Sequence, residues 1–103
     1  MYQIALCADV VAEIERMEYL LTEYGKRNQE WQYQTERFEN TQSLLDWIRE
    51  ERGKPDLLLM DIFMPGKTGI DAVRELRKEK YDVPVIFLTS SKEHALNAYE
   101  VDA

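Results

Sequence analysis

Short apolar runs alternate along this chain with longer segments in which apolar residues recur every three or four positions. The short runs predict β-strands, and the longer segments predict amphipathic helices with one face toward a core. The run at 56–60 is almost wholly apolar, as expected of a strand buried on both faces, whereas apolar and polar residues alternate over 31–38, as expected of a half-exposed strand. The predicted strands are residues 2–8, 31–38, 56–60 and 85–88.

The helical segments carry start and stop signals. Asn40 offers a cap for the second helix, and Thr68 and Asp71 have the spacing of a capping box at the start of the third. Gly25 stands in the usual stop position of the first helix. The first predicted helix covers residues 11–25, with a core stripe of Ile14, Met17, Leu21 and Tyr24. The second runs from Thr41 to near Gly53. The third carries the apolar residues Ile70, Val73 and Leu76, and the fourth begins at Ser90 and carries Leu96 and Tyr99.

Strand and helix alternate four times, which predicts an α/β fold with a doubly wound parallel sheet and helices on both faces, a three-layer α/β/α domain. In such folds ligands bind at the carboxyl ends of the strands. Three of the four predicted strands end there at a polar residue, namely Asp9, Asp61 and Thr89. Because these ends meet at one edge of the sheet, the sequence predicts a functional site at that edge.

Composition and charge narrow the class of function. The 103 residues are enough for one domain, and no apolar run approaches the ~20 residues that a membrane helix needs. The single Cys7 cannot form an internal disulfide, which favours a reducing compartment and a cytoplasmic location. A net charge of −7 is the opposite of what a phosphate-tracking surface needs, so direct binding of nucleic acid is not expected.

The carboxylate of Asp61 follows an apolar strand and precedes a loop with proline and glycine. It could bind a cation, act as a base, or attack phosphorus as a nucleophile, and the last role needs a hard cation such as Mg²⁺. Asp9 is a second candidate ligand, and Thr89 could donate its hydroxyl to a phosphoryl oxygen. Structural alternatives stay open, because Asp9 and Thr89 could cap helices and Asp61 could be a turn residue.

Several of these segments together resemble the receiver domains of response regulators. Residues 57–69 look like the phosphoacceptor segment, which is an apolar strand, Asp, two residues, Met-Pro, three residues and Gly. Residues 83–90 resemble the fourth strand with its switch threonine, and Ala8 and Asp9 match the acidic pair after the first strand. Residues 93–103 are similar to the fourth helix of receivers attached to LytTR-type (AgrA-type) DNA-binding domains.

The resemblance implies a flavodoxin-like (CheY-like) fold and a two-component signalling function. Asp61 would accept a phosphoryl group from a sensor histidine kinase, and Thr89 would bond that group and move on activation. Mg²⁺ would be bound by the side chains of Asp9 and Asp61 and by the backbone carbonyl of Phe63. The domain would be a phosphoacceptor switch and not a dedicated enzyme, and it would contact DNA only through an output domain outside this chain.

Two departures from the family pattern affect these expectations. Ala8 replaces the first acid of the pair, which normally holds the metal through water, so Mg²⁺ binding should be weaker. Residues 1–103 end before the expected fifth strand and last helix, and we interpret them as an incomplete receiver domain without the family's phosphoryl-pairing lysine and switch aromatic residue. The fourth strand, 85–88, would then be an uncovered apolar edge, which predicts self-association.

Two other functions stay open. A pseudo-receiver would use the same fold as a phosphorylation-independent interaction or dimerisation module, and Ala8 favours this alternative. The presence of Asp9, Asp61 and Thr89 favours the phosphoacceptor. An enzyme or nucleotide binder on the same architecture has less support, because neither a Gly-x-Gly-x-x-Gly motif after the first strand nor a Walker-type segment is present.

Overall fold

The computed structural model describes residues 1–50, 55–62, 64 and 66–88. Strands and helices alternate along this part of the chain, which confirms the predicted α/β class. The elements are β1 (Tyr2–Cys7), α1 (Val11–Arg27), β2 (Tyr33–Phe38), α2 (Thr41–Glu50), β3 (Leu57–Asp61), α3 (Gly69–Lys78) and β4 (Val85–Leu88).

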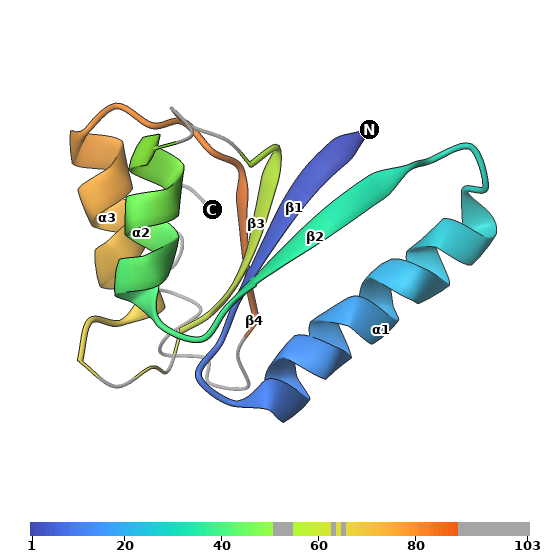
Figure 1. The fold of residues 1–103 in the computed structure, drawn as a ribbon, viewed down its shortest axis with the longest axis horizontal. Coiled ribbons are helices and arrows are strands. Elements are labelled where there is room, and N and C mark those ends of the chain that lie inside the picture. The colour runs from blue at the N-terminus through green and yellow to red at the C-terminus, as the bar shows by residue number, and fades with distance from the viewer. Residues whose placement is uncertain (51–54, 63, 65, 89–103) are drawn as a thin grey trace.

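The described strands form one parallel sheet in the order β2-β1-β3-β4. The chain leaves β1 first toward β2 and then returns to place β3 on the other side, so the order reverses at β1. Figure 1 shows α1 on one face of the sheet and α2 and α3 together on the other. Such a reversal leaves a crevice outside the carboxyl ends of the two strands that flank it, here β1 and β3.

Two apolar clusters hold the layers together, and strand alternation assigns residues to them. Along β1, Ala5 and Cys7 lie in the cluster with α2 and α3, whereas Ile4 and Leu6 lie in the cluster with α1. Leu58 and Met60 of β3 belong to the first cluster and are fully buried. The predicted two-sided burial of this strand is therefore confirmed for its central residues.

The first helix differs from the prediction at its end. It continues past Gly25 to Arg27, and the following Asn28 closes it through its backbone N–H to the Gly25 carbonyl and its side-chain amide to the Tyr24 carbonyl. Tyr24 was predicted in the core stripe, but 52% of its surface is exposed. Its ring packs edge-on against Trp31, with 4.7 Å between the ring centroids.

Side-chain caps place the other two described helices as predicted. The Asn40 side-chain oxygen accepts from the Ser43 backbone N–H at 2.8 Å, and the Thr68 hydroxyl accepts from the Asp71 N–H at 3.1 Å. The second strand begins at Tyr33, two residues later than predicted, because the Trp31 N–H turns back to the Asn28 carbonyl. The predicted fourth helix lies outside the described residues.

An ion-pair network joins α2 to α3. Arg49 donates from Nη2 to Glu75 Oε1 at 2.7 Å and from Nε to Glu79 Oε1 at 2.8 Å. Hydrogen bonds from Lys67 and Arg49 lower the pKa of Glu75, and a hydrogen bond from Arg49 lowers the pKa of Glu79. Helices from different parts of the chain are thus tied together on their outer side.

We expect the stability that Arg49 supplies to depend on pH. Because the carboxyl pKa values of Glu75 and Glu79 lie below their usual 4.5 in the folded protein, the contribution is complete above pH 4.5 and is lost as the pH falls below that value. An Arg49→Met protein should therefore be less stable than wild type at pH 7 and approach it at acid pH. Urea unfolding at several pH values measures this difference, and a constant difference would contradict the assignment.

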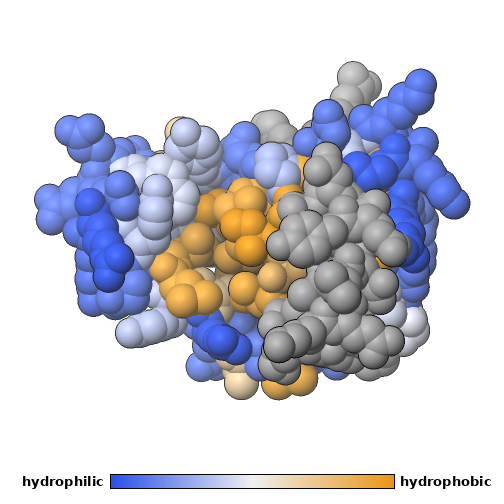
Figure 2. Space-filling view, turned by 180° about the vertical axis from the view of Figure 1, so that it is seen from behind, coloured by the Kyte–Doolittle hydropathy of each residue, from blue (hydrophilic) through white to orange (hydrophobic). Residues whose placement is uncertain are grey.

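The face of the sheet that carries α1 is only partly covered by the described residues. A groove of about 390 Å³ lies between α1 and the strands β3 and β4, and Figure 2 shows apolar side chains gathered on this side. Among the described strands β4 is an edge strand, and 50% of Ile86 is exposed. Self-association through this edge stays a prediction. No helix among the described residues is long and apolar enough to span a membrane.

Candidate functional site

Asp61 is the last residue of β3, at the carboxyl end of the sheet. It is partly buried, and the residues on either side of it, Met60 and Ile62, are almost completely buried. Its backbone pairs with Leu88 of β4. The carboxylate therefore stands on a backbone that both sheet pairing and core packing hold in place, as the sequence predicted.

Asp9 lies two residues beyond the end of β1, and its side chain is exposed. The alternative in which it caps the first helix is wrong. The N-cap residue is Val10, whose side chain makes no capping bond, and α1 begins with the Glu13 N–H donating to the Val10 carbonyl. The Asp9 carboxylate is not used to start the helix.

Asp9 and Asp61 both lie near Cys7 in the strand register. Burial and, to a smaller extent, the negative charges of Asp61 and Asp9 together raise the pKa of the Cys7 thiol to about 12. Cys7 pairs with Met60, the residue before Asp61, and Asp9 follows Cys7 by two positions, so both acidic residues come shortly after this pair at the carboxyl edge of the sheet. The Cys7 thiol itself faces the core, where it donates to the Asn40 carbonyl at 3.7 Å.

The loop between β3 and α3 closes tightly onto Asp61. The Gly69 N–H donates to the Ile62 carbonyl at 3.1 Å, so the chain returns to the end of β3 after seven residues. A Cβ atom on Gly69 would lie 2.5 Å from the Asp61 carbonyl oxygen, closer than real Cβ atoms approach. Only glycine permits this contact between the first turn of α3 and the backbone of Asp61.

Ala8 occupies the place of the missing acid. Cys7 is the last residue of β1 and pairs with Met60, so Ala8 and Asp61 are the residues that follow this pair. Ala8 is fully buried in the cluster that contains Ile14 and Met17 of α1. The departure read from the sequence is therefore an apolar contact in the structure, on the side of Asp61 where the family pattern has a carboxylate.

The described residues offer few ligands for a metal ion, but their number is sufficient for Mg²⁺. Among the described residues no group of three or more acidic, histidine or cysteine side chains could hold a metal ion. Mg²⁺ nevertheless needs only one or two protein carboxylates when water and phosphate oxygens complete its shell, and Asp9 and Asp61 supply two. The predicted carbonyl ligand Phe63 and the predicted switch residue Thr89 lie outside the described residues.

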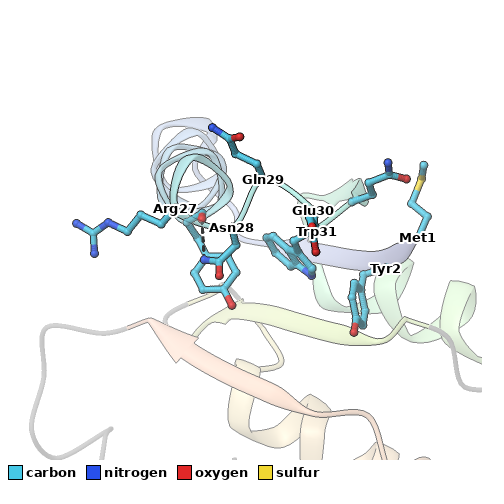
Figure 3. Close-up of a pocket in the computed structure, with 9 residues that line it drawn as sticks. Met1, Tyr2, Arg27, Asn28, Gln29, Glu30 and Trp31 are labelled. Atoms are coloured by element: carbon cyan, nitrogen blue, oxygen red, sulfur yellow. Dashed lines mark hydrogen bonds between the residues drawn. The ribbon is translucent and has the colours of Figure 1, made fainter.

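A second hollow, of about 680 Å³, lies at the opposite, amino end of the sheet. Figure 3 shows Trp31 and Tyr2 on one side of it and the Arg27 side chain pointing away from them. Tyr2 is the first residue of β1, so this hollow is separated from Asp61 by the length of the strands. Arg27 and Glu30 are the charged residues that line it.

Sequence reasoning gave no role to Lys67 or to Gly69 beyond the motif. Lys67 pairs with Glu75, eight positions later and on a different element, so no periodic spacing could reveal the contact. The close approach of Gly69 to Asp61 likewise depends on how α3 docks on the sheet. The glycine at the end of the phosphoacceptor motif was the signal in the sequence that could have indicated this close approach.

The fold and the paired carboxylates define an α/β domain with an acidic site at its topological switch point. The family described as "Response regulator receiver domain" matches residues 10–103, and the chain belongs to this family. Asp9 lies one residue before the matched range. Membership confirms the resemblance drawn from the motifs, and it identifies the chain as a receiver domain of a two-component response regulator.

Individual relatives agree with the family. The sensory transduction protein LytT of Bacillus subtilis (strain 168) is 38% identical over 65 residues, which are 63% of this chain and 26% of LytT. A DNA-binding response regulator of the LuxR family from Staphylococcus aureus has a TM-score of 0.78 at 20% identity, over 100% of this chain and 82% of that one. The Vibrio cholerae chemotaxis protein CheY4 has a TM-score of 0.75 at 20% identity, over 100% and 82%. These two structures confirm the fold.

Proposed function

We propose that this domain is a phosphoacceptor switch in which Asp61 accepts a phosphoryl group from a sensor histidine kinase. The observation that carries the proposal is the placement of two carboxylates at the carboxyl ends of the neighbouring strands β1 and β3, Asp9 just after β1 and Asp61 at the end of β3. The rigid backbone under Asp61 supports it, because in-line phosphoryl transfer depends mainly on positioning and electrostatics. Family membership supports the same function.

The transfer itself is a displacement at phosphorus. One oxygen of the Asp61 carboxylate forms a bond to phosphorus while the bond from phosphorus to the donor's leaving atom breaks. The leaving group, a histidine imidazole or a small carboxylate, departs with the bonding electron pair. The product is an acyl phosphate on Asp61, and because the protein is itself modified, we propose a switch and not a turnover enzyme.

We propose that Asp9 and Asp61 hold Mg²⁺ during this reaction, with the carbonyl of Phe63 as a further ligand. When bound, the cation would neutralise charge on the phosphoryl oxygens. Asp9 suits this role because its carboxylate is exposed and does not cap α1. Thr89 follows β4, the strand next to Asp61, and we propose that its hydroxyl bonds the phosphoryl group.

We propose that the parent protein carries a LytTR-type DNA-binding output domain and acts in the cytoplasm. The similarity to LytT supports this, although the match covers only 26% of LytT. DNA would then be contacted through the output domain alone. The net charge of −7 fits a domain that does not bind DNA directly.

The test is labelling with acetyl phosphate in the presence of Mg²⁺, followed by intact-mass measurement. We expect the mass of one phosphoryl group on wild type and none on Asp61→Asn or after chelation with EDTA. Peptide mapping should place the group on Asp61. An adduct that persists in Asp61→Asn would reject Asp61 as the acceptor, and absence of any adduct on wild type would reject the phosphoacceptor function.

A second candidate is the pseudo-receiver, and the burial of Ala8 favours it. An apolar residue packed beside Asp61 removes one of the carboxylates that this family uses to bind metal. A domain of this kind would bind the same partners with and without phosphodonor. The labelling experiment separates the two candidates, since only the phosphoacceptor gains mass.

A further inference from the structure

We propose that Lys67 is a positioning residue for Asp61, acting through an ion pair with Glu75 that fixes the loop between β3 and α3. The inference rests on the proposed function. Lys67 lies in this loop, six residues after Asp61, and its ammonium group contacts the Glu75 carboxylate on α3. It is thus bonded to the helix that follows the loop and not only to the loop's own residues.

Lys67 is also attached through its backbone. Its carbonyl accepts a hydrogen bond from the Thr41 hydroxyl at 3.4 Å, and Thr41 begins α2. Thr41 is 6% exposed and is the buried polar side chain of the described residues. One residue therefore connects the loop to α2 by its backbone and to α3 by its side chain.

The partner of Lys67 is itself held in place. Glu75 accepts from Arg49 of α2, which also bonds Glu79. About a third of each of the side chains of Lys67, Glu75 and Arg49 is exposed, compared with 68% of Lys26 in its local pair with Glu23. A partly sheltered network loses less to solvent screening than an isolated exposed pair.

A displacement of this loop would also move the backbone of Asp61, because the two are in close contact. The Gly69 N–H closes the loop on the Ile62 carbonyl, and Gly69 itself packs against the Asp61 carbonyl oxygen. Because the interior is close-packed at this point, a shift of Lys67 moves the start of α3 against the backbone of Asp61. The geometry makes Lys67 a remote determinant of how Asp61 is presented, without contact to the reacting atoms.

The experiment compares Lys67→Met, Lys67→Arg and the control Lys26→Met by two measurements. The first is hydrogen exchange of the Gly69 amide by NMR, and the second is the rate of Asp61 labelling by acetyl phosphate. Loss of a partly exposed ion pair in a network should change each of these two rates by up to about fivefold. We expect Lys67→Met to exchange faster and label more slowly on that scale, Lys67→Arg to restore both, and Lys26→Met to match wild type.

The two measurements separate failure of this inference from failure of the proposed function. Unchanged Gly69 exchange in Lys67→Met would overturn the role of the ion pair in holding the loop, whether or not the protein is labelled. Faster exchange with an unchanged labelling rate would overturn the role in positioning Asp61. A wild-type protein that takes no label would overturn the proposed function and with it any part for Lys67 in the reaction.

Discussion

A Gly69→Ala protein is expected to be about 2 kcal/mol less stable than wild type and to label much more slowly at Asp61. The added Cβ would lie 2.5 Å from the Asp61 carbonyl oxygen and 2.7 Å from Met60 Cγ. The first of these contacts is with backbone, so relief requires α3 to move away from β3 or the end of β3 to bend. Either movement disturbs the residue proposed to accept phosphate.

The measurement is urea unfolding together with acetyl phosphate labelling, and Gly25→Ala is the matched control. Gly25 lies inside α1, where a Cβ would meet only the Tyr33 ring edge at an ordinary 3.9 Å. Alanine there should raise the free energy of unfolding by about 0.5–1 kcal/mol, because it restricts the unfolded chain. If both variants were stabilised alike, the close approach of Gly69 to Asp61 would be disproved.

The sequence predicted the strands and helices that the structure describes, and it predicted that Asp9 and Asp61 lie at the same edge of the sheet. It could do so because apolar runs and helix spacing are local signals, and because parallel strands bring Asp9 and Asp61 to one edge whatever the details of packing. The caps at Asn40 and Thr68 are equally local, since each bonds a backbone N–H three residues away. These features need no knowledge of the tertiary structure.

Other features depend on which elements pack together, and there the sequence was insufficient. Tyr24 continues the apolar spacing of α1, but it stays half exposed and its ring packs against Trp31. Gly25 did not end α1, because Asn28 supplies the closing bonds one turn later. The partners of Lys67 and Arg49 come from separate elements, and only the packing of α2 on α3 brings them together.

An Ala8→Asp substitution is expected to strengthen the response to Mg²⁺. Ala8 and Asp61 follow the last paired residues of β1 and β3, and Ala8 is fully buried in the cluster with α1. Without a cation, a carboxylate there is desolvated and repelled by Asp61, which should cost about 1–3 kcal/mol of stability. With Mg²⁺ present, the same carboxylate can hold the metal's water ligands, and affinity should rise about tenfold, the scale of an outer-ligand contact.

Thermal unfolding of Ala8→Asp with Mg²⁺ and with EDTA measures both effects, since a ligand that binds only the folded state raises the melting temperature in proportion to its binding free energy. Ala8→Asn is the matched control, because it adds a polar group of the same size without the charge. Ala8→Asn should be destabilised equally in both conditions, whereas Ala8→Asp should recover with Mg²⁺. Equal behaviour of the two variants would mean that the position beside Asp61 does not face a cation, and the burial of Ala8 would then be a packing feature alone.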